Sequence, residues 1–123
     1  MNLVYDSGAL IAAEAGVERM WALHSRALER GIVPILPTPV LTEVWRGGAR
    51  EHKLQEFVAS CQIEDLIEDI SKAAGVLLAK ADHGVTDAVV TECALRRTSA
   101  CVTSNRAHIL ELAAPRRVHI IDV

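Results

Sequence analysis

The chain is poor in aromatic residues and in long apolar runs. Only 3% of its 123 residues are aromatic, namely Tyr5, Trp21, Trp45 and Phe57. Proteins that bind bases by stacking use aromatic side chains as platforms, so this scarcity argues against recognition of nucleobases by stacking. The longest apolar runs cover a handful of residues, as at 75–79, whereas about 20 are needed to cross a bilayer. A transmembrane protein is therefore excluded, and the first residues lack the basic and apolar regions of a signal peptide.

Cysteine usage and net charge set further limits. The three cysteines are an odd number at irregular spacing, which excludes a complete disulfide framework or a four-cysteine zinc site within one chain; they are Cys61, Cys93 and Cys101. Each lies among apolar neighbours, so we expect small buried side chains. Because no disulfide framework is expected, the predicted compartment is the reducing cytoplasm. The net charge of −3 argues against binding of nucleic acid through bulk electrostatic attraction.

The chain does carry enough apolar material for one hydrophobic core. Half of its residues are hydrophobic and 24% are charged, which excludes a disordered chain. A chain of this size buries roughly 65% of its unfolded surface. Because no linker, repeat or low-complexity tract divides it, we expect a single domain over residues 1–123.

Short apolar segments alternate with helical ones. Strands are expected at 3–5, 32–36, 62–64, 100–103 and 118–121. Helices are expected to open at Ser7, to cover 17–29, to run from 37–39 to Gly47, and to cover about 50–60, 70–81, 87–96 and 104–113. Thr86 and Ser104 are expected as helix caps. The proline inside 32–36 indicates an irregular end or an edge strand.

Alternating strands and helices with apolar strands predict an α/β fold, in which a parallel sheet is covered by helices on both faces. Ligands of such folds bind outside the carboxyl ends of the strands. Two helices, 17–29 and 50–60, also carry apolar residues that fit either core packing or a docking groove: Trp21, Leu54 and Phe57.

Three carboxylates fall where this topology gathers side chains. Asp6 directly follows the first strand, Glu43 lies about a turn into the helix after the second, and Asp87 lies in the first turn of the helix before the fourth. Asn105 follows the end of the fourth strand. With right-handed crossovers, all four side chains face the same edge of the sheet.

Carboxylates in one cleft repel each other, two unit charges 4 Å apart by about 4 kcal/mol at an effective dielectric near 20. A cation or shared protons must therefore hold them together. Oxygen ligands select Mg²⁺ or Mn²⁺ rather than Zn²⁺, and such an ion favours phosphodiester hydrolysis by polarising a phosphoryl group and lowering the pKa of a bound water. In the alternative interpretation, Asp6 and Asp87 are cap or first-turn acids, each worth roughly 0.5–1 kcal/mol against the helix dipole.

Four segments, read in order, resemble the motif series of PIN domains: 4–10, 39–44, 86–90 and 102–105. The nearest resemblance is to the VapC-type ribonuclease toxins of bacterial toxin–antitoxin systems, and it covers essentially the whole chain. It implies a PIN-like three-layer α/β/α fold with a central parallel sheet of four to five strands. It also implies a Mg²⁺- or Mn²⁺-dependent endoribonuclease, a homodimer, and a small cognate VapB-type antitoxin that inserts a segment into the cleft.

The resemblance assigns roles position by position. Asp6, Glu43 and Asp87 match the family's three acids, which are catalytic and bind the metal. The family often has a fourth acid where this chain has Asn105, whose amide oxygen is a ligand without charge. We therefore expect one well-held ion and a second that is weaker or completed by substrate. The hydroxyl of Thr103 or Ser104 resembles the family's Ser/Thr that orients the first aspartate.

Other polar residues have more than one interpretation. Among the remaining acids, Glu92 lies about 140° around its helix from Asp87, Asp82 is in a loop from which it can swing inward, and Asp122 is expected to be solvated. Arg46 and Arg106 are candidate contacts to RNA or phosphate, with ordinary surface charge as the alternative. Arg46 lies three residues after Glu43 and could instead pair with it. None of the five histidines pairs with another His or a Cys at ligand spacing, and no metal-binding role is expected for His83.

Two other functions are alternatives to a ribonuclease toxin. A PIN-like module that binds a partner with weak or no nuclease activity is motivated by Asn105. A phosphoacceptor receiver domain requires paired acids after the first strand and a lysine after the last. Here Asp6 stands alone and residues 118–123 contain no lysine, so the receiver is set aside.

Overall fold

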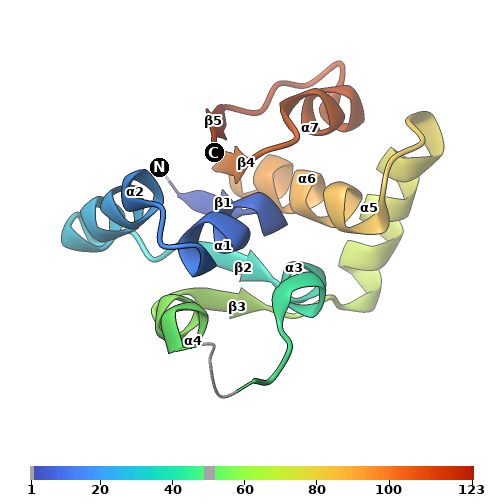
Figure 1. Cartoon of the computed structure of the whole chain (residues 1–123). Coiled ribbons are helices and arrows are strands. Elements are labelled where there is room, and N and C mark those ends of the chain that lie inside the picture. Colours follow the sequence, from blue (N-terminus) through green and yellow to red (C-terminus); the bar gives the residue numbers. More distant parts are fainter. Residues whose placement is uncertain (1, 49–51) are drawn as a thin grey trace.

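A five-stranded parallel sheet lies at the centre of the molecule (Figure 1). The structure is a computed structural model and describes residues 2–48 and 52–123. The elements along the chain are β1 (Leu3–Tyr5), α1 (Ser7–Glu14), α2 (Glu18–Glu29), β2 (Ile35–Pro37), α3 (Thr38–Val44), α4 (His52–Ala59), β3 (Gln62–Glu64), α5 (Glu68–Lys80), α6 (Val85–Arg97), β4 (Ala100–Thr103), α7 (Arg106–Ala113) and β5 (Ile120–Asp122). The strand order is β3-β2-β1-β4-β5, with every neighbouring pair parallel. The expected α/β/α fold with four to five parallel strands is confirmed.

The chain changes its direction of travel across the sheet at β1. It first proceeds from β1 through β2 to β3, and then crosses to β4 on the other side of β1. Helix α1 packs against α2, α3 and α4, whereas α6 packs against α5, α7 and the central strands; Figure 1 shows these two groups around the sheet. In open α/β sheets the crevice for ligands lies at such a switch point, which here is between the carboxyl ends of β1 and β4.

Three of the four aromatic residues pack together in or against the core. Tyr5 and Phe57 are fully buried and stack with ring centroids 5.4 Å apart. His24 lies 4.1 Å from Phe57, and the half-buried Trp21 meets Phe57 edge-on at 5.2 Å. Leu54 is also fully buried. Of the two interpretations for Trp21, Leu54 and Phe57, core packing is thus the one observed.

The second strand starts later than expected, because its first residues finish the preceding helix. Gly31 has a φ of +74°, and the N–H of Ile32 donates to the carbonyl of Ala27 over 2.9 Å. This pattern is typical of a helix that ends on a left-handed glycine. The carbonyl of Pro34 accepts from the N–H of Gln62, and β2 lies between β1 and β3. Of the two alternatives for the proline, the edge strand is therefore wrong, whereas the irregular end is confirmed, because Pro34 lies just before the regular part of β2.

The N-caps of two helices also differ from the predicted ones. Helix α6 begins at Val85 with Gly84 as its N-cap, so Thr86 lies inside the first turn and does not cap it. The N-cap of α7 is Asn105, not Ser104. The expected helix over 50–60 is described from His52 onward, and its first two positions lie outside the described residues.

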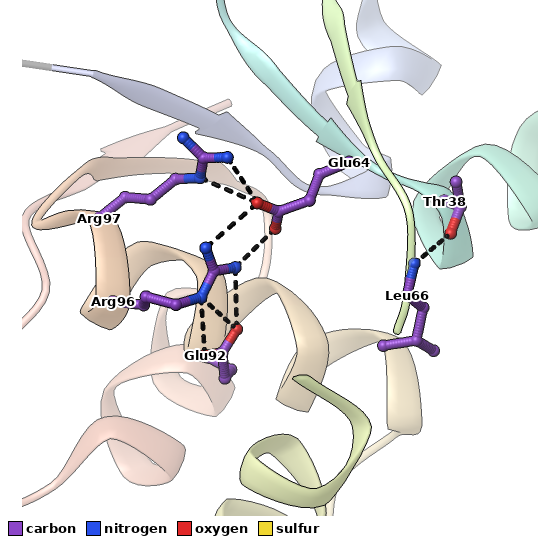
Figure 2. Close-up of polar contacts among 6 residues, drawn as sticks. All are labelled: Thr38, Glu64, Leu66, Glu92, Arg96 and Arg97. Atoms are coloured by element: carbon purple, nitrogen blue, oxygen red, sulfur yellow. Dashed lines mark hydrogen bonds and ion pairs between the residues drawn. The ribbon is translucent and has the colours of Figure 1, made fainter. Parts of the chain in front are cut away.

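Ion pairs fasten the edge strand β3 to the end of α6 (Figure 2). The carboxylate of Glu64 binds Arg96 at 2.7 Å and Arg97 at 2.6 Å, and Arg96 also pairs with Glu92 at 3.0 Å. Burial raises the pKa of Glu64, but the hydrogen bonds from Arg96 and Arg97 outweigh it and bring the pKa to about 2. Glu64 is thus a charged clamp between strand and helix.

Candidate functional site

Asp6 lies at the centre of the candidate site. It follows β1 directly, is the N-cap of α1, and has no exposed surface. Its Oδ1 accepts the N–H of Ser7 at 2.8 Å, and its Oδ2 accepts the hydroxyl of Thr103 at 2.6 Å. Thr103 is the last residue of β4, so this bond connects the carboxyl ends of β1 and β4 at the switch point.

A small residue is needed beside Asp6. A Cβ placed on Gly8 would lie 2.5 Å from the Oγ of Ser104, closer than such atoms approach. The absence of a side chain at position 8 therefore lets α1 start against the segment that follows β4. Of the two hydroxyls expected to orient Asp6, Thr103 makes the contact, whereas Ser104 packs against Gly8.

The electrostatics of Asp6 connect it to the other two acids. Burial is the main cause that raises the pKa of Asp6, while the hydrogen bonds from Thr103 and Ser7 lower it. The negative charges of Asp87 and Glu43 raise it further. Asp87 and Glu43 thus lie near enough to Asp6 for their charges to act on it.

Glu43 and Asp87 differ in how firmly they are held. Glu43 is exposed on α3 and has no hydrogen-bond or ion-pair partner within residues 2–48 and 52–123. Asp87, in the first turn of α6, has a side chain only 15% exposed, and its Oδ2 lies 3.0 Å from Nδ1 of His108. Glu43 can therefore change rotamer freely, whereas Asp87 is fixed.

His108 was missed by the sequence analysis. It lies on α7 and stacks on His83, with ring centroids 4.2 Å apart and an interplanar angle of 20°. His83 in turn contacts the carboxylate of Glu111 at 2.7 Å. The two histidines are far apart in the sequence, and only the packing of α7 beside α6 brings them together. The spacing of three between Asn105 and His108 was the one available signal, since it places both near the start of one helix.

Asn105 meets the site through its backbone. Its N–H donates to the hydroxyl oxygen of Thr103 at 2.9 Å, and its exposed side chain forms no capping bond. Thr103 therefore donates to Asp6 and accepts from Asn105 through the same oxygen. This fixes the direction of its hydroxyl proton.

Both candidate arginines are paired with carboxylates. Arg106 binds Asp122 at 2.7 Å, which raises the pKa of Arg106 and lowers that of Asp122. Arg46 binds Glu14 at 3.0 Å. Both arginines are largely exposed. Exposed ion pairs contribute little free energy, so either arginine could exchange its carboxylate partner for a phosphate at a small free-energy cost.

The donor set suits a hard divalent cation, although the side chains do not yet surround one. Within residues 2–48 and 52–123, no three Asp, Glu, His or Cys side chains stand close enough together to hold a metal ion. The donors on offer are carboxylate and amide oxygens, which Mg²⁺ and Mn²⁺ prefer. A buried aspartate whose pKa is raised by burial and by two neighbouring charges is a group that a cation would stabilise. Glu43, which is exposed and has no partner within residues 2–48 and 52–123, is the least restrained of the three acids.

Solved structures with the same architecture cover nearly the whole chain. The VapBC2 complex of Rickettsia felis, bound to a DNA fragment from its promoter, matches over 99% of this chain and 98% of the other, with a TM-score of 0.77 and 14% identity. The chain has the PIN-like fold. A toxin–antitoxin complex from Klebsiella pneumoniae matches over 97% and 95% (TM-score 0.71, 18% identity), and FitAcB from Neisseria gonorrhoeae over 97% and 96% (TM-score 0.69, 12% identity). No family model and no curated protein matches the sequence.

The PIN-like fold confirms what the four motifs indicated about architecture. At identities of 12–18%, these structures establish the fold alone. In the described part of the chain, no helix combines the length and the apolar character needed to span a membrane.

Proposed function

We propose that this chain is a VapC-type PIN-domain toxin that hydrolyses RNA phosphodiester bonds as a Mg²⁺- or Mn²⁺-dependent endoribonuclease. The observation that carries the proposal is the fully buried Asp6, held by Thr103 and facing the charges of Asp87 and Glu43. A purely structural N-cap would gain nothing from two further carboxylates nearby, because they destabilise its charge.

The residues of the site have different roles in the proposed reaction. Asp6, Glu43 and Asp87, with the amide oxygen of Asn105, would hold the cation, which when bound polarises a phosphodiester and lowers the pKa of a water. The hydroxyl of Thr103 donates to one oxygen of Asp6. This hydrogen bond fixes the orientation of the Asp6 carboxylate. Arg46 and Arg106 would bind RNA phosphates after leaving Glu14 and Asp122.

An acidic chain with few aromatic residues can still bind RNA if other groups supply the affinity. Affinity would come from the cation and from local arginines, and the RNA would be recognised by its phosphates and shape more than by stacked bases. Binding to RNA without a divalent cation should accordingly be weak.

The partners follow from the neighbours and from an apolar groove. The similar structure from Klebsiella pneumoniae is a toxin–antitoxin complex, and we propose a VapB-type antitoxin here, together with a homodimer of this chain. An open groove of about 450 Å³ is lined by α3, α4 and β3, with Leu41, Trp45 and Ile63 as its largest apolar residues. An antitoxin segment seated there would lie beside the helix that carries Glu43.

A PIN-like module that binds a partner without turnover is the second candidate. It is favoured by Asn105 in place of a fourth acid and by the separation of the carboxylates as they stand among the described residues. Incubation of purified protein with an RNA pool in Mn²⁺ distinguishes the two. Cleavage that Asp6→Asn abolishes supports the ribonuclease, whereas no cleavage of any RNA supports the module.

A further inference from the structure

His108 joins the candidate site through a defined hydrogen bond. Its Nδ1 lies 3.0 Å from Oδ2 of Asp87. A carboxylate only accepts hydrogen bonds, so the proton of this bond must lie on Nδ1 of the imidazole. This holds for the neutral Nδ1–H tautomer and for the imidazolium alike, and the contact therefore persists in either charge state.

His108 is itself held in place. Its ring stacks on that of His83 at 4.2 Å, nearly parallel, and Nε2 of His83 contacts Glu111 at 2.7 Å. The side chain of His83 is only 15% exposed, whereas that of His108 is 45% exposed. An exposed histidine rarely keeps one orientation unless something fixes its ring, and here a second ring and a carboxylate do so.

The hydrogen bond divides the two oxygens of Asp87. Oδ2 is occupied by His108, and Oδ1 has no hydrogen-bond partner within the described ranges 2–48 and 52–123. Asp6 also has an orienting side-chain donor, since Thr103 donates to one of its oxygens, while its other oxygen accepts from the N–H of Ser7. Each fixed acid thus has an orienting donor from the β4–α7 part of the chain.

We propose that His108 is a positioning residue that orients the carboxylate of Asp87 toward a divalent cation, and that His83 and Glu111 support it. The inference rests on the proposed function, because it requires Asp87 to be a cation ligand. Donors that orient metal-binding side chains typically change metal affinity 10- to 100-fold when they are removed.

The test measures Mn²⁺ affinity by isothermal titration calorimetry, with no RNA present. His108→Ala should weaken Mn²⁺ binding by about 10-fold or more. His108→Asn should restore most of the affinity, because the asparagine Nδ2 reaches nearly where Nδ1 stood. The control is His119→Ala, which removes an exposed histidine just before β5 and should leave the affinity unchanged.

The outcomes separate the inference from the proposed function. If the wild-type chain binds Mn²⁺, Asp6→Asn abolishes binding and His108→Ala binds as tightly as wild type, the positioning role is overturned while the proposed function stands. If the wild-type chain binds no Mn²⁺, the proposed function fails and the inference fails with it.

A second measurement needs no metal. Long-range ¹H–¹⁵N spectra of the histidine rings distinguish the two tautomers, and the signal that His108→Asn removes identifies His108. The Nδ1–H form is expected in the wild type and should be lost in Asp87→Ala. An Nε2–H tautomer in the wild-type protein would overturn the proposal.

Discussion

The hydroxyl of Thr103 donates to Oδ2 of Asp6 over 2.6 Å, although the two residues stand 97 positions apart in the chain. The bond joins the ends of two neighbouring parallel strands, β1 and β4. Because the Thr103 hydroxyl also accepts from the N–H of Asn105, the hydroxyl proton is directed toward the carboxylate of Asp6. The orientation of Asp6 is therefore set by the fold before any ligand binds.

Thr103→Val keeps the shape of the side chain and removes the hydroxyl. The hydrogen bond from Thr103 lowers the pKa of Asp6, so its loss should raise that pKa further and leave a buried carboxylate with one donor fewer. We expect a loss of about 1–3 kcal/mol in the free energy of unfolding, measured in urea, and slower RNA cleavage. Thr103→Ser, which keeps the hydroxyl, should recover most of both quantities. Equal stability and activity of Thr103→Val and wild type would contradict the role given to this bond.

Glu43→Gln tests the repulsion among the acids. Glu43 is exposed, and its charge raises the pKa of Asp6. Its removal should leave the metal-free free energy of unfolding within about 0.5 kcal/mol of wild type or slightly higher, while RNA cleavage in Mn²⁺ is lost. Glu56→Gln, on the exposed side of α4, is the matched control and should change neither quantity. Retention of cleavage by Glu43→Gln would remove this residue from the site.

His24 should make stability depend on pH. It is buried, its Nδ1 lies 2.8 Å from the hydroxyl of Tyr5, and its Nε2 lies 2.6 Å from the Oγ of Ser60. Because the Ser60 hydroxyl donates to the carbonyl of Phe57, Nε2–H donates to Ser60 and Nδ1 accepts from Tyr5. These contacts suit a neutral ring, and burial lowers the pKa of His24 below the usual 6.5. The unfolded chain therefore binds the proton more readily, so stability is full above pH 6.5 and declines as the pH falls below it.

The pH prediction is checked by urea unfolding between pH 5.5 and 7.5. Wild type should lose stability toward the acid end of that window, and His24→Gln should show a flatter profile even if it is less stable throughout. His119→Gln, which removes an exposed histidine, should retain the wild-type slope. A profile that is the same in wild type and His24→Gln would show that another group titrates there.

The clamp at Glu64 gives a fourth prediction. Glu64→Gln leaves Arg96 and Arg97 without their shared carboxylate (Figure 2). Because the arginines are partly exposed, we expect a moderate loss, about 1–2 kcal/mol in the free energy of unfolding, with cleavage retained. The wild-type advantage should also shrink as pH falls from 4.5 toward 2, since the folded state holds Glu64 ionised to a pKa of about 2. A variant as stable as wild type at neutral pH would show that the clamp contributes nothing.

The sheet, and the elements that carry the candidate acids, could be predicted from the sequence because both depend on local patterns. Asp6 and Thr103 end apolar strands, and parallel strands bring such ends to one edge. The start of β2 was missed because Ile32 completes the glycine end of α2, a bond that depends on backbone conformation. The contact of His108 with Asp87 was missed for a different reason: it depends on how α7 packs against α6, and no periodicity in the sequence encodes that packing. The metal-binding roles of Asp6, Glu43, Asp87 and Asn105 stay predictions.

The rate of RNA cleavage as a function of Mn²⁺ concentration tests the central claim most directly. The wild-type chain should cleave an RNA pool at a rate that rises with Mn²⁺ and saturates, and EDTA should stop it. Asp6→Asn, which keeps the size of the side chain, should reduce the rate to the level seen in EDTA while remaining folded. Cleavage that is independent of Mn²⁺, or that survives in Asp6→Asn, would contradict an active site built around Asp6.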